Sequence, residues 1–442
     1  MLRRGRRMSA GLALLSRVWT ELGGDPRILG ELASGAGEVP LPSRVATGDL
    51  AWASVGLATL AAGRHPSAMD PARIAMAYRS DRVLTIDGTA PPVWAALSGF
   101  WRTADGWIRT HGNYPHHATG LRAGLRLGST ADAADVRDAL AGRTSAEAIE
   151  SISTAGGLAV AVSDEDPAAD ARLRQTALLD IRPIGTADPR RDVLSGSSSH
   201  PLTGIRVLDL TRVIAGPVCT RTLALLGADL LRVDPPGLPE PEWQHLDTGH
   251  GKRSTLLDAR SARFEELLAG ADVVVLGYRP AALARLGLDP PSLARRHPGL
   301  IVAQLSAWGM DHPQRAGFDS LVQAESGIAL IESPDGERPG ALPAQALDHS
   351  AGYLLAAAVT MLLRRRAREG GSWWVQTSLR RVAAELLGMP RRAEPDDEVA
   401  LDPAPHVARF PVGDTELVTA RPALPGFEFA APHPWGADQP RW

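Results

Sequence analysis

The chain has 442 residues, of which 44% are hydrophobic and 22% are charged, and its formal net charge is −3. This length is enough for two or three domains with buried cores. The near-neutral charge gives no bulk basicity, so nucleic acid and anionic membrane are not expected as partners. The only cysteine, Cys219, excludes an internal disulfide framework and fits a reducing cytosol.

The N-terminal 40 residues are predicted to form helices, and their basic start resembles a signal peptide only briefly. The apolar run at 11–15 is shorter than the ~7–15 residues of a secretory core and ends at Arg17. The longest apolar run, 351–363, is shorter than the ~20 residues needed to cross a bilayer. We therefore expect a cytoplasmic protein.

A partial internal repeat links two distant segments. Residues 41–63 and 342–363 each contain Leu-Pro, a short spacer, an aspartate (Asp49 or Asp348) and an alanine-rich apolar helix. The segment 72–80 corresponds roughly to 373–381, and both are predicted to be strands.

Residues 98–127 predict two strands around the 104–106 turn, followed by a helix. Helices near 131–141 and 144–156 and a glycine-led strand at 156–164 follow. Within this region HGNYPHH (111–117) leaves three alternatives open: a metal site, a loop lining a substrate pocket or an ordinary polar turn. Its spacing matches no structural zinc pattern, so no metal site is predicted.

A βαβ unit follows the linker predicted at 196–200. It consists of a strand at 206–210, a turn at 215–217, a helix at 219–226 and a second strand at 228–233. Such a unit predicts a parallel sheet and the α/β class. The segment 384–442, proline-rich from Pro390 onward, is expected to run over the surface as extended chain.

Five further blocks complete the pattern: GHGKRSTLLD (249–258), ADVVVLGYRPAALARLG (271–287), LIVAQLSAWG (300–309), GFDSLVQAESG (317–327) and PAQALDHSAGY (343–353). With the βαβ unit, and in this order, they resemble the family III coenzyme A transferases and the related 2-methylacyl-CoA racemases. The resemblance covers 201–383.

This resemblance implies a Rossmann-like, CoA-binding and catalytic domain at 196–383. Residues 41–195 are similar to the smaller α/β domain that forms the C-terminal half of family members, so the two halves stand in swapped order. It also implies a homodimer, because family members interlock large and small domains of different chains.

Asp348 is the predicted catalytic residue. From the sequence alone, an aspartate opening a helix is either an N-cap or a nucleophile. The resemblance implies a nucleophile that forms a mixed anhydride and then an aspartyl-CoA thioester. It therefore implies an acyl-CoA:carboxylate CoA-transferase, with an acyl-CoA and a carboxylic acid as substrates and no permanently bound cofactor.

By the same resemblance, coenzyme A is held by Lys252, Arg253, Tyr278, Arg279 and Arg285. Cations suit its phosphates, since arginine can bind phosphate oxygens bidentately and lysine supplies a point charge. The fingerprints GxGxxG and GxxxxGK[ST] are absent from the sequence, which disfavours nicotinamide and nucleoside-triphosphate chemistry.

Arg212, Phe318 and Asp319 are predicted to line the substrate pocket, with Asp319 either orienting the pocket or forming a buried ion pair. Arg212, Ile214 and Pro235 differ from the residues of formyl-CoA transferases, and the glycine-rich loop of that subgroup has no counterpart. A formate or oxalate substrate is therefore not expected. A racemase and a degenerate acyl-CoA-binding relative are the alternatives.

Overall fold

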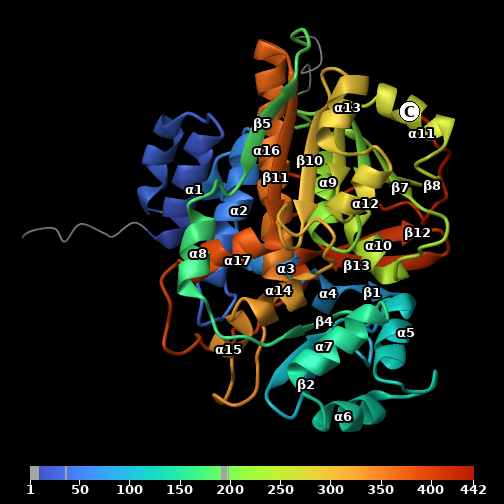
Figure 1. Ribbon diagram of the computed structural model, residues 1–442. Coiled ribbons are helices and arrows are strands. Elements are labelled where there is room, and N and C mark those ends of the chain that lie inside the picture. The colour runs from blue at the N-terminus through green and yellow to red at the C-terminus, as the bar shows by residue number, and fades with distance from the viewer. Residues whose placement is uncertain (1–8, 35–36, 191–196, 198) are drawn as a thin grey trace, which may run out of the picture.

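The computed structural model describes residues 9–34, 37–190, 197 and 199–442. Its centre is a seven-stranded sheet in the order β5-β11-β10-β9-β6-β7-β8 (Figure 1). The strands are β5 (Asp180–Gly185), β6 (Arg206–Leu210), β7 (Asp229–Asp234), β8 (Arg253–Leu256), β9 (Val273–Leu276), β10 (Ile301–Ser306) and β11 (Ser372–Ser378). Part of the linker predicted at 196–200 lies outside the described residues.

All neighbouring strands pair in parallel except β5, which lies antiparallel to β11 at one edge. Counted from β6, the parallel strands have the order 3-2-1-4-5-6, which is that of doubly wound α/β sheets. The prediction of an α/β fold with a parallel sheet is confirmed.

Helices cover both faces of this sheet. On β6, Val207 packs with α9 (Ala215–Leu225) and α16 (Ala346–Glu369), while Leu208 packs toward α11 (Ala262–Ala269), α12 (Pro280–Arg285) and α13 (Pro290–Arg296). This alternation follows from the two-residue period of a strand. Because both faces are buried, the strands are continuous apolar runs such as VVVL at 273–276.

The long helix α16 also packs against α2 (Thr47–Ala61), which in turn packs against α1 (Ala10–Glu21). Helices α2 and α16 belong to the two segments of the predicted repeat, and Asp49 and Asp348 each lie in the first turn of their helix. Although α16 is long and apolar enough to cross a membrane, it is almost entirely buried within the protein. It is the central helix of the core.

The strand predicted at 72–80 is wrong. Residues 71–78 form α3 (Pro71–Tyr78), whose N-cap Asp70 accepts a hydrogen bond from the Ala72 N–H. An aspartate followed by proline at the first helical position is a start signal for a helix, and it prevails over the β-like composition. The second predicted strand, 373–381, ends at Ser378, where α17 (Leu379–Leu387) begins.

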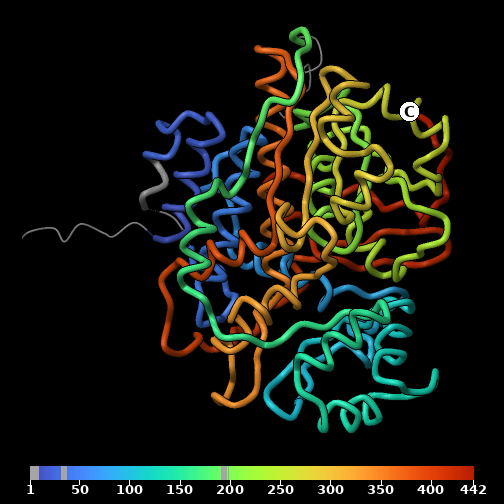
Figure 2. Tube along the Cα trace, viewed as in Figure 1, coloured from blue at the N-terminus to red at the C-terminus, as the bar shows by residue number. Residues whose placement is uncertain are grey.

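A smaller unit lies beyond the carboxyl ends of the parallel strands (Figure 1). Its antiparallel sheet has the order β2-β3-β4, and Trp101, Ile108 and Leu121 belong to its separate core. The elements are β2 (Gly99–Arg102), β3 (Trp107–Thr110), β4 (Ala159–Ala161), α5 (Pro115–Gly124), α6 (Ala133–Ala141) and α7 (Ser145–Thr154). They agree with the predicted order of elements. Figure 2 shows the chain then running back to the main sheet through α8 (Pro167–Arg174) and β5.

The C-terminal tail contains a hairpin that the sequence analysis does not predict. Strands β12 (Val407–Val412) and β13 (Thr415–Ala420) pair with each other and join at Gly413, which has a φ of +58°, and β13 also pairs with β1 (Thr85–Ile86). The last residues lie along β8, where the Ser254 N–H donates to Asp438. The tail therefore covers an edge strand of the main sheet.

Candidate active site

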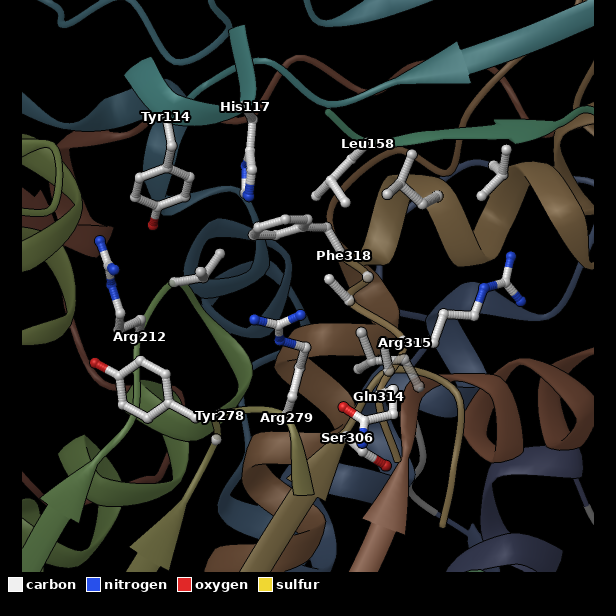
Figure 3. Close-up of a pocket in the computed structure, with 18 of the residues that line it drawn as sticks. Tyr114, His117, Leu158, Arg212, Tyr278, Arg279, Ser306, Gln314, Arg315 and Phe318 are labelled. Atoms are coloured by element: carbon white, nitrogen blue, oxygen red, sulfur yellow. The ribbon is translucent and has the colours of Figure 1, made fainter. Parts of the chain in front are cut away.

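A cavity of about 610 Å³ opens at the carboxyl ends of β6, β9 and β10. The loops that follow β6 and β9 supply Arg212 and Tyr278, and β10 supplies its last residue, Ser306. The small unit supplies the opposite wall through Tyr114 and 156–160 (Figure 3). The connections from β6 and β9 diverge here, and in doubly wound sheets ligands bind at this switch point. The fold therefore places a crevice between the two units of one chain.

Asp348 lies on the wall of this cavity, in the first turn of α16. Its neighbour Gly352 brings α16 close to α9, since a Cβ there would stand 2.6 Å from the Ala215 carbonyl oxygen. Ala215 begins α9 and also lines the cavity. Asp348 is thus held where two helix N-termini favour negative charge. The structure agrees with a site at Asp348, and its catalytic role stays a prediction.

The Asp348 carboxyl is poorly solvated. Only 5% of the residue is exposed, and no described residue donates a hydrogen bond to its side chain. Burial first, and the nearby charge of Asp319 second, raise its pKa well above the ordinary value. We therefore expect Asp348 to hold a proton more tightly than an exposed aspartate.

Asp319 does not line the pocket, which corrects the prediction. It is fully buried at the start of α14 (Asp319–Glu325), and its Oδ2 accepts the Asp348 main-chain N–H at 2.9 Å. Its other oxygen accepts from Gln323, whose own Oε1 accepts the Leu342 N–H at 2.8 Å. Burial raises the pKa of Asp319 to about 6. Of its two predicted roles, orientation agrees with the structure, and no ion pair forms with a described residue.

The turn between β6 and α9 is strained. Val213 has a φ of +74°, which is rare for a β-branched residue and costs on the order of 1–3 kcal/mol. Arg212 beside it lines the pocket, as predicted, with its guanidinium 4.7 Å from the centre of the Tyr114 ring. This cation–π contact joins the main sheet to the small unit.

Tyr278 and Arg279 follow β9 and line the pocket. Figure 3 shows the Arg279 guanidinium pointing into the cavity toward Phe318, and no described residue is a hydrogen-bond or salt-bridge partner of this group. Arg285 lies exposed at the rim, where it donates to Gln314 at 3.4 Å. Tyr278 and Arg279 can thus contact an anionic ligand in the cavity, whereas Arg285 does not line it and its role stays a prediction.

Lys252 and Arg253 do not reach the cavity, which corrects their predicted role in holding coenzyme A. The Lys252 side chain is fully buried, with its Nζ 3.0 Å from Asp209 and 2.6 Å from Thr220 Oγ1. Burial lowers its pKa to about 8. Arg253 begins β8, at the amino edge of the sheet, and pairs with Asp229. Their sequence block therefore enters the sheet at the end opposite the pocket.

The HGNYPHH segment is part of the pocket wall. The rings of His111 and Phe318 stack with their centres 3.6 Å apart, and Tyr114, His116 and His117 line the cavity beside them. Burial lowers the pKa of His117 to about 4, so its imidazole is neutral at pH 7. Among the described residues, no group of three His, Cys, Asp or Glu side chains is placed to hold a metal ion.

Sequence reasoning missed some wall residues, among them Leu158 and Arg315. Arg315 forms a salt bridge with Glu325 and lies 3.7 Å above the Trp308 ring. Neither residue belongs to a motif with an evident chemical role, so only the fold brings them to the site.

The fold and site thus define a doubly wound α/β protein with an arginine-lined crevice around a buried aspartate. Residues 202–394 match the model of CoA-transferase family III. This segment of the chain is therefore similar to that family.

The chain is also similar to curated proteins. A probable fatty acyl-CoA transferase from Mycobacterium tuberculosis is 33% identical over 239 residues, or 49% of this chain and 60% of that protein. A succinyl-CoA:glutarate CoA-transferase from Mus musculus is 31% identical over 216 residues, or 45% of this chain and 49% of that protein. The chain therefore spans about half to three fifths of the length of these relatives.

Two solved structures are also similar. A hypothetical protein from Mycobacterium tuberculosis is 34% identical, with a TM-score of 0.39, over 42% of this chain and 56% of that chain. A CAIB/BAIF family protein from Brucella suis is 25% identical, with a TM-score of 0.38, over 49% and 65% of the two chains.

Proposed function

We propose that the protein is an acyl-CoA:carboxylate CoA-transferase whose nucleophile is Asp348. The observation that carries this proposal is the position of Asp348: a buried carboxyl on the wall of a crevice that also carries Arg212, Arg279 and Arg315. The names of the relatives describe the same class of reaction.

In the proposed reaction, ionised Asp348 attacks the thioester carbonyl of the donor. The C–S bond breaks, coenzyme A leaves as a thiolate, and an aspartyl–acyl anhydride remains. The thiolate then attacks the aspartyl carbonyl, which releases the donor carboxylate and forms an aspartyl-CoA thioester. The acceptor carboxylate attacks this thioester, and the thiolate returns to the acyl carbonyl of the second anhydride and regenerates Asp348. Two easier acyl transfers thus replace one difficult exchange.

The surroundings of Asp348 support these steps. Desolvation makes its ionised form a stronger nucleophile than an exposed carboxylate, once a substrate has displaced water from the cavity. The N-terminus of α9 begins at Ala215 on the cavity wall, and the unpaired N–H groups of such a helix start would stabilise the negative charge that develops on the carbonyl oxygen. The coenzyme phosphates would be held by Arg279 and Arg285, with Tyr278 beside them.

We further propose a Rossmann-like mode of CoA binding, a cytoplasmic location and a homodimer. Cys219 is free and buried, which is compatible with a reducing compartment. Coenzyme A enters this scheme as a substrate, and no permanently bound cofactor takes part.

Mass spectrometry of the intact protein tests the proposal. The protein is incubated with a panel of acyl-CoAs, and the expected result is a covalent coenzyme A adduct that maps to Asp348. The Asp348→Asn variant is the matched control, because asparagine has nearly the same shape as aspartate but cannot form the anhydride, and the N-cap of α16 is Gln345 rather than Asp348. Acyl-CoA binding with no adduct and no transfer would instead identify a degenerate acyl-CoA-binding protein.

A further inference from the structure

Four residues, 211–214, connect β6 to α9, and they decide where the first turn of α9 lies relative to Asp348. Within this turn Val213 has the left-handed backbone that valine rarely adopts. Such a conformation persists only when the surroundings hold it. A neighbouring group must therefore stabilise the positive φ of Val213.

The Glu240 carboxylate stabilises this conformation. Its Oε1 accepts the Val213 main-chain N–H at 2.7 Å, and its Oε2 accepts from the Arg232 guanidinium. The Glu240 side chain is 1% exposed and that of Arg232 is fully buried. Arg232 also donates to Asp234 at 2.7 Å, which fixes the guanidinium from a second side. A buried, charge-assisted hydrogen-bond network therefore ends on the N–H of the strained residue.

The loop that carries Glu240 makes a second contact with the same turn. The Pro239 carbonyl oxygen accepts from Arg212 at 2.9 Å, and Leu238 of this loop lines the cavity. Residues 236–239 are exposed, whereas Glu240 is turned inward. The loop thus holds the turn at two consecutive residues, Arg212 and Val213, both of which line the pocket.

We propose that Glu240 is a positioning residue of the transferase site, an inference that rests on the function proposed above. By holding Val213 in the left-handed conformation, it sets Arg212 against Tyr114 and places the start of α9 beside Asp348. Without the carboxylate, Val213 relaxes toward a negative φ, and both groups move away from their positions around the reacting carbonyl.

Glycine provides the decisive test, because it adopts a positive φ without steric cost. Four proteins are compared: wild type, Glu240→Ala, Val213→Gly and the double variant. Glu242→Ala is the matched control, since Glu242 is an exposed carboxylate two residues away. We expect Glu240→Ala to lower kcat/KM by about tenfold or more, mainly through kcat, while Glu242→Ala does not.

In the Val213→Gly background, removal of Glu240 is expected to change kcat/KM by less than about threefold, because the turn no longer needs the carboxylate. Equal losses in both backgrounds would overturn the proposal and leave Glu240 as a general stability residue. If Glu240→Ala does not fold, Glu240→Gln takes its place, since its amide oxygen can still accept from Val213 while its NH₂ group faces Arg232. The loss of activity caused by Glu240→Gln should then be smaller in the Val213→Gly background than in the wild-type background.

Amide hydrogen exchange of the segment 211–216 gives a readout that does not need turnover. We expect faster exchange there in Glu240→Ala than in Glu242→Ala, with the rest of the main sheet unchanged. If the wild-type protein transfers nothing, the proposed function fails, but this exchange measurement still tests the hold on Val213. Unchanged exchange at 211–216 would refute that hold.

Discussion

Asp319 Oδ2 accepts the main-chain N–H of Asp348 at 2.9 Å, so one buried carboxylate fixes the helix turn that carries another. The two have different environments. Asp319 accepts hydrogen bonds from main-chain N–H groups and from Gln323, whereas no described residue donates to the Asp348 side chain. Asp319 therefore ionises first, and its charge together with burial keeps Asp348 protonated to a higher pH.

The first prediction concerns Asp348→Asn, which should abolish transfer without loss of stability. We expect activity to fall by about three orders of magnitude or more, because the amide cannot act as the nucleophile. The folded-state pKa of Asp348 is raised, so its contribution to stability is present at low pH and is lost as pH rises from about 4 through that pKa. The variant should therefore unfold at a higher temperature than wild type at pH 8, with a smaller difference at pH 5. Near-normal turnover would show that Asp348 is structural.

The second prediction concerns Asp319→Asn. Removal of the neighbouring negative charge should lower the pKa of Asp348, so its nucleophilic form would be present at lower pH. In a plot of log kcat/KM against pH, the ascending limb should move toward lower pH, although the maximum falls because the turn at 347–348 is less well held. Gln323→Leu is the comparison, because it keeps the Asp319 carboxylate but removes a hydrogen bond that holds its pKa down, so the limb should move by less than in Asp319→Asn. An unmoved limb would mean that Asp319 acts through hydrogen bonding alone.

The parallel sheet and the edge at which its pocket opens could be predicted from the sequence, for a physical reason. The βαβ pattern and the VVVL run at 273–276 indicate buried parallel strands, and residues that follow such strands meet at one edge of the sheet. Arg212, Tyr278 and Arg279 obey this rule. Asp348 was identified by resemblance, since periodicity alone does not separate a nucleophile from an N-cap.

The remaining parts of the site depend on tertiary contacts that a linear pattern does not encode. Lys252 precedes β8, so it lies at the amino end of the sheet, and only the position of α9 shows that it is buried on Asp209. The wall at 156–160 reaches the pocket because the small unit folds over it. Glu240 lies in a proline-rich loop with no periodicity, and its role depends on the backbone of Val213, 27 residues earlier.

The third prediction separates the cations in the pocket or at its rim from those that lie away from it. Arg279→Ala and Arg285→Ala should each weaken coenzyme A binding by about 1–3 kcal/mol, typical of lost charge-assisted hydrogen bonds. Arg253→Ala, at the amino edge, should leave the affinity unchanged. Isothermal titration calorimetry at two salt concentrations measures this, and unchanged affinity in both Arg279→Ala and Arg285→Ala would remove these residues from the site.

The fourth prediction is that Lys252→Met lowers the stability of the protein rather than its affinity for coenzyme A. It leaves Asp209 buried without its cation, so the free energy of unfolding should fall by about 3–5 kcal/mol. The coenzyme A affinity of the folded fraction should stay near that of wild type. Denaturant unfolding followed by calorimetry distinguishes this result from a lost phosphate contact, which would lower affinity at unchanged stability.

The last prediction is that the enzyme does not exchange the α-proton of a 2-methylacyl-CoA. Such exchange needs two groups that can each hold a proton near neutral pH. Phe318 cannot titrate, and its ring stacks on His111. His349, next to Asp348 in sequence, is buried against Tyr78 with ring centres 5.0 Å apart and does not line the cavity. His117 does line it, but burial lowers its pKa to about 4, which makes its protonated form scarce. Incubation in deuterated water followed by mass spectrometry should therefore find no deuterium at the α-carbon. Deuterium incorporation at a rate comparable to turnover would contradict the transferase assignment, and its loss in His117→Phe but not in His349→Phe would identify His117 as the base.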